Sequence, residues 1–265
     1  MPNTIPIVDS HAHLNMADFD ADRQTVLKRT FEDGIRAVLC PAELTDPDRL
    51  DIAIDMKDFS PAVLMAAGIH PHQAGKTVGN FPEKLRILRD NGHIHAVGEI
   101  GLDFFYDFSP RKAQIHIFRE QLQAAETLQL PVIIHSRDAA ADILESVQGE
   151  RFTQGGVLHC FTEGWNLAKA MLDLGFFISF SGILTFPKAG DLRETAQRIP
   201  ADRLLVETDS PYLTPVPFRG KIKRNEPRYV RETARTLAAL HHMSEEELGI
   251  RTTANFESCF RFEIP

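Results

Sequence analysis

The stretch SPRKAQIHIFREQLQAAETLQLPVIIH, residues 109–135, contains a helix pattern followed directly by a strand pattern. Ser109 suits the N-cap of a helix and Pro110 its first position, and apolar residues then recur at helical spacing as far as Ala125. The run PVIIH (131–135) lacks the polar alternation of a half-exposed strand, so it predicts a strand that is buried on both faces. A helix that leads into such a strand is the repeating unit of a parallel sheet covered by helices.

The same unit recurs along the whole chain. Further runs rich in Val, Ile, Leu and Phe stand at 5–8, 37–40, 62–68, 95–99, 156–161, 176–182 and 204–208. With 131–135 they make eight predicted strands, separated by helical patterns and without a glycine-rich phosphate fingerprint. We therefore predict a (β/α)8 TIM-like barrel in the α/β class, with a doubly wound open sheet as the alternative. No linker or shift in composition divides the chain, so 1–265 is predicted to be a single domain, with a long functional loop at 209–227 after the eighth strand.

Composition excludes some classes of function. The chain is 43% hydrophobic and 25% charged, with a net charge of −8 and a pI near 5.8. Such a protein does not grip nucleic acid by a broad basic surface, although a nuclease with a local site stays possible. Three cysteines without framework spacing predict reduced thiols. Because the sequence has no signal-peptide pattern and no apolar run near the roughly 20 residues of a membrane span, we expect a cytoplasmic protein that does not contact a membrane.

Histidines and acidic residues gather where the predicted strands end. A single histidine or acid in such a place is most simply a loop residue or a helix cap, and Asp103 is interpreted as a cap on that ground. Six of eight strands with such an ending instead predict a metal site at the carboxyl-end mouth of the barrel, because imidazole and carboxylate suit zinc, manganese and similar ions. The residues concerned are His11, His13, His70, His72, Glu99, His135, His159, Glu207 and Asp209.

The number of these candidates favours two metals. A catalytic zinc ordinarily takes three protein ligands and a water, and more candidates than that are present. Glu99, on the fourth strand, could bridge two ions about 3.5–4 Å apart, an arrangement suited to hydrolysis at phosphorus.

Several motifs together resemble the TatD family of metal-dependent deoxyribonucleases. They are VDSHAHL, GIHPH, VGEIGLDFFYD, PVIIHSRDA, GGVLHCFTE, GFFISFSGILTF, RLLVETDSPYLTPVPFRGK, RNEP and TTANF, and they run from Val8 to Phe256. The resemblance implies an amidohydrolase-like TIM barrel that hydrolyses phosphodiester bonds in DNA, with 3′→5′ exonuclease or related activity. It also implies two divalent ions per chain, which could be Zn, Mn, Mg or Ni.

The resemblance assigns metal ligands residue by residue. It implies that one ion is held by His11, His13 and Asp209, that Glu99 bridges to a second ion, and that this second ion is held by His135 and His159. Asp209 also matches the acid that the family places beside the attacking water, so it is predicted to be ligand and general base at once.

Two further residues are predicted to assist the reaction. Glu207 resembles a carboxylate that orients a ligand or a water, and His70 is predicted to be a donor on the substrate side rather than a ligand. His72 is interpreted as structural, held by the turn at Pro71.

Substrate contacts are predicted on two loops. Arg219 and Lys221 follow the eighth strand, close to the place where barrels often hold phosphate, and Arg224 adds positive charge or simply keeps the loop soluble. Phe218 departs from the family, which often has histidine there.

Aromatic residues follow the fourth strand. Phe104 and Tyr106 are predicted to stack on a base, while Phe105 is expected to pack its loop. Cys160, next to a predicted ligand, is expected to be a packed thiol that points away from the site.

Two other functions are open on the sequence. A related two-metal enzyme could hydrolyse a small ester, amide or aminoacyl ester, but many such barrels bridge their metals with a modified lysine, and here no lysine ends a predicted strand. A non-catalytic binding module with a vestigial site is disfavoured because the full ligand set is present. The expected partner is therefore DNA as substrate, and no stable protein partner is implied.

Overall fold

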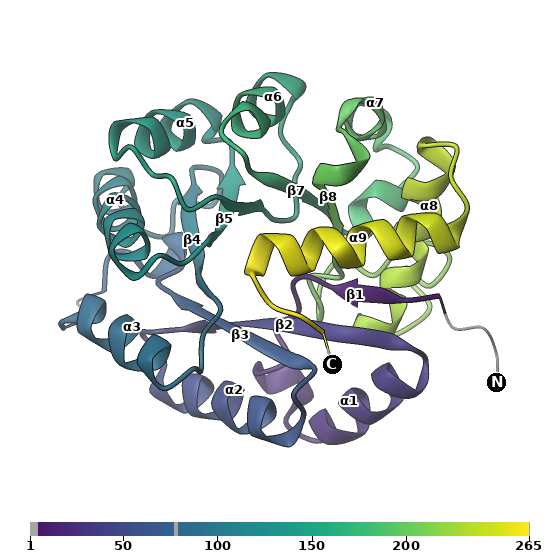
Figure 1. The fold of residues 1–265 in the computed structure, drawn as a ribbon, viewed down its shortest axis with the longest axis horizontal. Helices are drawn as coiled ribbons and strands as arrows, with labels where there is room; N and C mark the ends of the chain where they lie inside the picture. Colours follow the sequence, from purple (N-terminus) through teal and green to yellow (C-terminus); the bar gives the residue numbers. More distant parts are fainter. Residues whose placement is uncertain (1–4, 77–78, 265) are drawn as a thin grey trace.

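The computed structural model describes residues 5–76 and 79–264, and within them eight parallel strands form one sheet in the order of the chain. Figure 1 shows this sheet wound into a barrel, which confirms the predicted fold class and excludes the open doubly wound sheet. The strands are β1 (Ile7–Asp9), β2 (Ile35–Glu43), β3 (Val63–Gly68), β4 (Ala96–Asp103), β5 (Val132–Arg137), β6 (Gly156–Leu158), β7 (Phe177–Phe180) and β8 (Leu204–Val206).

Helices surround the sheet, as Figure 1 shows, and α9 lies across one end of the barrel. Their bounds are α1 (Arg23–Glu32), α2 (Pro47–Phe59), α3 (Phe81–Asp90), α4 (Arg111–Leu128), α5 (Ala140–Gly149), α6 (Trp165–Asp173), α7 (Gly190–Arg198), α8 (Val230–Leu240) and α9 (Glu245–Phe260). Across the described ranges, no helix combines the length and the apolar character that crossing a membrane requires.

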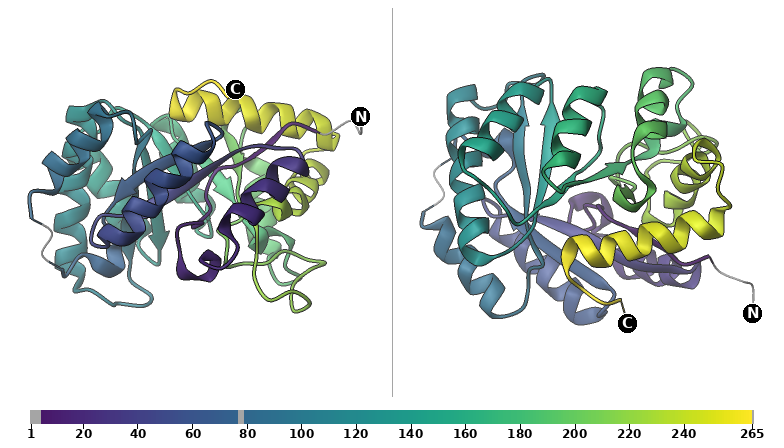
Figure 2. Two further views of the ribbon diagram at one scale, coloured as in Figure 1. Left: turned by 90° about the horizontal axis from the view of Figure 1, so that it is seen from below. Right: turned by 45° about the horizontal axis from the view of Figure 1, so that its top comes forward.

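Each strand divides its side chains between two apolar layers. In β2, Ala37 and Leu39 belong to a cluster inside the barrel, whereas Val38 and Cys40 belong to the larger cluster between the sheet and its helices. The inner cluster also contains Phe256 and Phe260 of α9, so α9 closes the amino end of the barrel. Figure 2 shows α9 on one side of the molecule and the loops that follow β1 and β8 on the opposite side, where the mouth lies.

The predicted strands are all present, with changes at their ends. β4 continues to Asp103, four residues beyond the predicted end at Glu99, whereas β8 ends at Val206, two residues short. The predicted N-cap of α4 is wrong, because the helix begins at Arg111 after Pro110. Ser109 instead accepts a hydrogen bond from the backbone of Gly75 and donates one to that of His72.

The barrel closes between β8 and β1. The backbone N–H of Ser10 donates to the carbonyl of Val206 over 3.1 Å, and Ala12 pairs with Ser210 as a parallel bridge beyond the two strand ends. The predicted loop follows, and a short 3-10 helix at Pro227–Tyr229 leads from it into α8. The seam thus runs on into the loops at the mouth.

Candidate metal centre

The inner face of the barrel changes from apolar to polar toward the mouth. In β5, Ile133 of the inner cluster is followed two residues later by His135. In the same way, Val157 of β6 is followed two residues later by His159, just beyond the end of that strand. Because side chains two residues apart in a strand share a face, the polar layer stands above the apolar layer that α9 closes.

Three other predicted ligands stand on the seam of the barrel. The N–H of Asp209 donates to the carbonyl of His11 over 2.9 Å, and the N–H of His13 donates to the carbonyl of Ser210 over 2.8 Å. Asp209 has a φ of 52°, in the left-handed region, so the chain turns sharply there. The hydrogen bonds that close the barrel therefore also place His11, His13 and Asp209 side by side.

Glu99 lies at the centre of the cluster, with each carboxylate oxygen facing a different group of imidazoles. It is 6% exposed, so its charge is almost entirely removed from bulk water. Its Oε2 is 3.3 Å from His11 Nε2 and 3.6 Å from His13 Nε2. Its Oε1 is 2.7 Å from His159 Nε2, 3.0 Å from His135 Nδ1 and 3.2 Å from His70 Nε2.

The first group has the spacing of donors around one ion. His11 Nε2 and His13 Nε2 are 3.1 Å apart, and Asp209 Oδ1 is 3.3 Å from the latter and 3.9 Å from the former. Nitrogens and carboxylate oxygens that converge in this way all offer lone pairs, so they need a proton or a cation between them. A tetrahedral zinc site with bonds of about 2.0–2.1 Å separates its donors by about 3.3 Å, so these residues fit a divalent metal.

The second group contains the other predicted ligands and one more histidine. The donor atoms of His70, Glu99 and His135 lie within 4.8 Å of one another, as do those of His11, His159 and Asp209. The two groups therefore adjoin. His70, predicted on the substrate side, stands among the potential ligands, and the sequence signal for it was its place after the third strand.

In the second group, a buried carboxylate stands behind each of the rings of His135 and His159. Asp103 Oδ2 is 3.1 Å from His135 Nε2, and Glu207 Oε1 is 3.3 Å from His159 Nδ1. Such a carboxylate fixes the proton on the far nitrogen of the ring, which leaves the near nitrogen free to bind a metal. Glu207 thus stands where an orienting carboxylate was predicted.

The interpretation of Asp103 as a helix cap is wrong. It is fully buried at the end of β4, its Oδ2 also lies 3.0 Å from His72 Nε2, and its Oδ1 accepts the N–H groups of Phe105 and Tyr106. The spacing of two from Glu99 through Gly101 to Asp103 was a signal that could have revealed it.

Asp9 braces the loop that carries His11 and His13. Its Oδ1 accepts the N–H groups of Thr208 and His11 over 2.9 and 3.3 Å, and its Oδ2 accepts the Thr208 hydroxyl over 2.6 Å. Complete burial raises the pKa of Asp9 well above its ordinary value, although these hydrogen bonds oppose the rise. Ser10 ties the same turn to β7 through the Ser179 hydroxyl.

The carboxylates of the centre stay ionised. Burial by itself would raise the pKa of Glu99, but the charges of His159 and His70 outweigh burial and hold that pKa well below its usual range. Burial also opposes ionisation of Asp209, and its hydrogen bond with His13 lowers its pKa nonetheless. Burial lowers the pKa of His70 to about 4. Burial by itself would lower the pKa of His159, but the charges of Glu99 and Glu207 raise it well above its usual value. The centre therefore holds carboxylates beside protonated imidazole, and a divalent ion would take the place of those protons.

A cavity of about 780 Å³ opens above the centre, and its wall includes Glu99, His135 and Asp209. Its wall also includes charged residues that the sequence alone did not indicate, among them Glu43 and Arg137. Both close their strands, β2 and β5, which was the available signal. The Glu43 carboxylate accepts the N–H of His70 over 2.9 Å, and burial raises the pKa of Glu43.

The predicted substrate contacts separate into two sets. Tyr106 lines the cavity, whereas Phe104 packs against the outer core with the Arg111 guanidinium over its ring. Arg219 and Lys221 are exposed on the loop after β8 and do not belong to the cavity wall, and Arg219 lies over Phe186.

Three further residues near the mouth of the barrel, Arg224, Phe218 and Cys160, are held by specific contacts. Arg224 is not a free charge, because it pairs with Asp22 and Glu226. Phe218 packs on Tyr229. The expectation that Cys160 points away from the site is wrong, because β6 ends at Leu158 and Cys160 lines the cavity in a left-handed conformation with φ 44°.

His72 and Phe105 differ in how far they are held by the surrounding structure. The His72 ring is held by Asp103, which agrees with a structural role. Phe105 is 56% exposed, so it does not pack its loop as expected.

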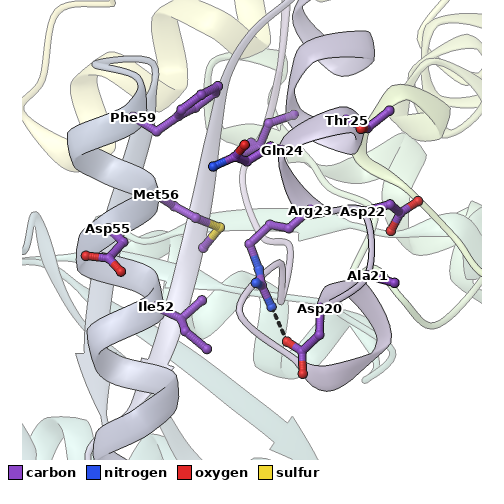
Figure 3. Close-up of a pocket in the computed structure, with 11 residues that line it drawn as sticks. Asp20, Ala21, Asp22, Arg23, Gln24, Thr25, Ile52, Asp55, Met56 and Phe59 are labelled. Atoms are coloured by element: carbon purple, nitrogen blue, oxygen red, sulfur yellow. Dashed lines mark hydrogen bonds and ion pairs between the residues drawn. The ribbon is translucent and has the colours of Figure 1, made fainter.

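A second cavity of about 370 Å³ lies outside the barrel between α1 and α2. Figure 3 shows its wall, with Phe59 and Met56 on α2 and an ion pair between Arg23 and Asp20. It contains none of the donor groups described above, so the candidate chemistry belongs to the mouth of the barrel.

This chain is similar to known proteins over nearly its whole length. The family model described as TatD related DNase matches residues 8–261. The protein named uncharacterized metal-dependent hydrolase YcfH, from Escherichia coli (strain K12), is 42% identical over 97% of this chain and 96% of its own length. A protein of Erwinia billingiae named 3′-5′ ssDNA/RNA exonuclease TatD is 34% identical over 96% and 98%. The crystal structure of the TatD homologue YjjV of Escherichia coli K12 superposes with a TM-score of 0.89 at 27% identity, covering 97% of this chain and 98% of that one.

Proposed function

This chain belongs to the TatD-related DNase family of metal-dependent hydrolases, and from that premise we propose that it cleaves phosphodiester bonds in DNA as a 3′→5′ exonuclease. The observation that carries the proposal is Glu99, a single carboxylate with imidazoles at both oxygens. A carboxylate so placed can join two ions, and pairs of ions about 3.5–4 Å apart are a recurrent device for displacement at phosphorus. The name of the Erwinia relative agrees with this assignment.

The ligands follow from the two donor groups. His11, His13 and Asp209 would hold one ion and His135 and His159 the other, with Glu99 between them. Bound there, the ions would supply positive charge that lowers the pKa of a water and offsets negative charge on the phosphate.

The residues of the chain divide the remaining work. Asp209 lines the cavity and takes the proton of the attacking water, as the new P–O bond forms and the bond from phosphorus to the 3′-oxygen breaks. Glu207 keeps His159 in orientation. His70, 22% exposed in the cavity wall, holds the phosphate beside the second group.

The shape and charge of the cavity support cleavage at a chain end. Its volume of about 780 Å³ falls within the range of sites for small ligands, roughly 300–1,000 Å³. A terminal nucleotide can enter such a cavity, whereas a duplex cannot. Because the chain carries a net charge of −8, binding depends on the centre itself and on a few local cations.

Outer contacts extend the site. Arg219 and Lys221, exposed after β8, would meet phosphates farther along the strand. Phe104, in the loop between β4 and α4, packs against the outer core and would support that loop beside the substrate. Tyr106, in the cavity wall, would contact the base.

The test is hydrolysis by purified protein of known metal content. Labelled single-stranded and double-stranded DNA, RNA, and small phosphoesters and carboxylic esters are incubated with each of Zn, Mn, Mg and Ni. We expect stepwise shortening of single-stranded DNA from the 3′ end, lost on addition of a chelator and absent from Glu99→Gln. Hydrolysis of a carboxylic ester without cleavage of any phosphodiester would overturn the proposal.

A further inference from the structure

Three exposed aromatic side chains stand together at the edge of the cavity, in the loop between β4 and α4. Phe105, Tyr106 and Phe108 are 56%, 47% and 67% exposed. Exposed rings of this size that gather beside a cavity commonly mark a binding surface. We name these three residues the aromatic loop.

The rings of the aromatic loop have a fixed arrangement. Those of Tyr106 and Phe108 are stacked, with centroids 5.3 Å apart and planes 9° from parallel. The His72 ring stands edge-on to both, 5.6 Å from Tyr106 and 4.8 Å from Phe108. Because Asp103 holds His72 and also accepts the N–H of Tyr106, the stacked pair is positioned before any ligand binds.

Arg137 adds a positive charge to this surface. Its Cζ lies 4.1 Å from the centroid of Phe105 and 4.7 Å from that of Tyr106, and the residue lines the cavity. Within the described part of the chain, its guanidinium has no hydrogen bond or ion pair. A guanidinium stacked on rings keeps the N–H groups at its edge free, and their fork matches the oxygens of a phosphate.

The surface adjoins the metal centre. Arg137 and His135 both lie in β5, two residues apart, so they share a face and their Cα atoms are separated by about 7 Å. Asp103 connects the two places as well, since its Oδ2 faces both His135 and His72. A phosphate on Arg137 therefore lies within one nucleotide of the centre.

We propose that Tyr106, Phe108 and Arg137 form a nucleotide subsite, in which one unpaired base stacks on the Tyr106–Phe108 pair and Arg137 binds the phosphate attached to it. The proposal rests on the proposed function, because it assigns the part of the nucleic-acid substrate that lies next to the scissile bond. A base inside a duplex has both faces covered by its neighbours, so the subsite selects an unpaired base.

The test uses paired substrates and matched variants. A labelled single-stranded oligonucleotide is compared with the same oligonucleotide carrying abasic residues at its last two 3′ positions, for both cleavage and binding by fluorescence anisotropy without added metal. Phe108→Ala is compared with Phe59→Ala, a phenylalanine 52% exposed at the end of α2, in the wall of the second cavity (Figure 3).

The expected results are specific to base stacking. Phe108→Ala should weaken binding and raise KM for the normal strand about 5-fold to 150-fold, the range for one stacked base, and should change neither for the abasic strand. Phe59→Ala should behave as the wild type on both. Equal losses on the two strands, or no loss on either, would overturn the base-stacking half of the subsite.

Arg137 has its own readout. A single phosphate contact contributes about 0.7 to the slope of log affinity against log salt concentration for single strands. Arg137→Met should lower the slope by that amount, and Arg203→Met, a change at an arginine over Phe177 at the opposite end of the barrel, should not. An unchanged slope refutes the phosphate contact. If the wild type cleaves no nucleic acid, the proposed function fails, while the binding measurements still decide on the subsite.

Discussion

Replacing Asp103 by asparagine is expected to weaken metal binding, although Asp103 contacts no metal itself. Its Oδ2 faces His135 Nε2 at 3.1 Å and His72 Nε2 at 3.0 Å, while its Oδ1 accepts two backbone N–H groups at 3.0 and 2.9 Å. The carboxylate is therefore surrounded by donors, and it keeps the proton of His135 on Nε2. The Nδ1 of that ring, 3.0 Å from Glu99, stays free for a metal.

An asparagine cannot satisfy these donors in either orientation. If its NH2 group faces the imidazoles, the proton of His135 moves to Nδ1, the atom that should bind metal. If the NH2 group instead faces the backbone of the aromatic loop, it opposes two N–H groups. A hydrogen bond to a charged group contributes about 1.5–3 kcal/mol, and the loss of a carboxylate behind a ligand costs about 10-fold to 100-fold in metal affinity. The two ranges agree, since such factors correspond to about 1.4–2.7 kcal/mol.

The assay is equilibrium dialysis of metal-free protein against zinc, with bound metal measured by mass spectrometry and folding checked by circular dichroism. The matched control is Asp107→Asn, which makes the same change of charge at an exposed residue of the same loop. We expect Asp103→Asn to bind the ion on the His135 side of the centre about 10-fold to 100-fold less tightly than the control variant does. Affinities within twofold of each other would refute the reasoning that Asp103 sets the proton position of His135.

Three further changes test other parts of the structure. Glu99→Gln should reduce bound metal from the two ions per chain that we propose to fewer than one, measured by elemental analysis, because its amide nitrogen would face imidazoles; an unchanged content contradicts the proposed bridging role. Asp209→Asn should lower turnover about 100-fold to 10,000-fold, the contribution of general base catalysis, and by more than it lowers metal affinity; wild-type turnover rules out that role. Burial and the charge of Lys57 lower the pKa of His95 to about 4. Between pH 6.5 and 4 the unfolded chain therefore binds a proton that the folded chain does not. As the pH is lowered through this range, the free energy of unfolding should decrease by at most about 3 kcal/mol. His95→Gln should flatten that slope in urea unfolding at several pH values, and His116→Gln, at an exposed histidine, should not; equal slopes refute the assignment.

The sequence by itself determined the barrel and the composition of its centre. Uninterrupted apolar runs such as 131–135 indicate strands buried on both faces, and this pattern is local, so it can be recognised without knowing which strands pair. The same holds for polar residues that end those runs. Because parallel strands bring their carboxyl ends to one mouth, Glu99, His135 and His159 could be placed together before any contact was known.

Tertiary structure alone decided which residues support that centre and which lie apart from it. The carboxylate of Asp103 meets a ring 32 residues away, and the hydrogen bonds that aim His11 and Asp209 exist only because β8 closes on β1. Packing likewise turned Phe104 into the core and stacked Arg137 on Phe105 and Tyr106 at the wall of the cavity. The period of a strand fixes the face on which a side chain lies, but how far that side chain reaches, and what it meets, depends on loops whose paths no local pattern encodes.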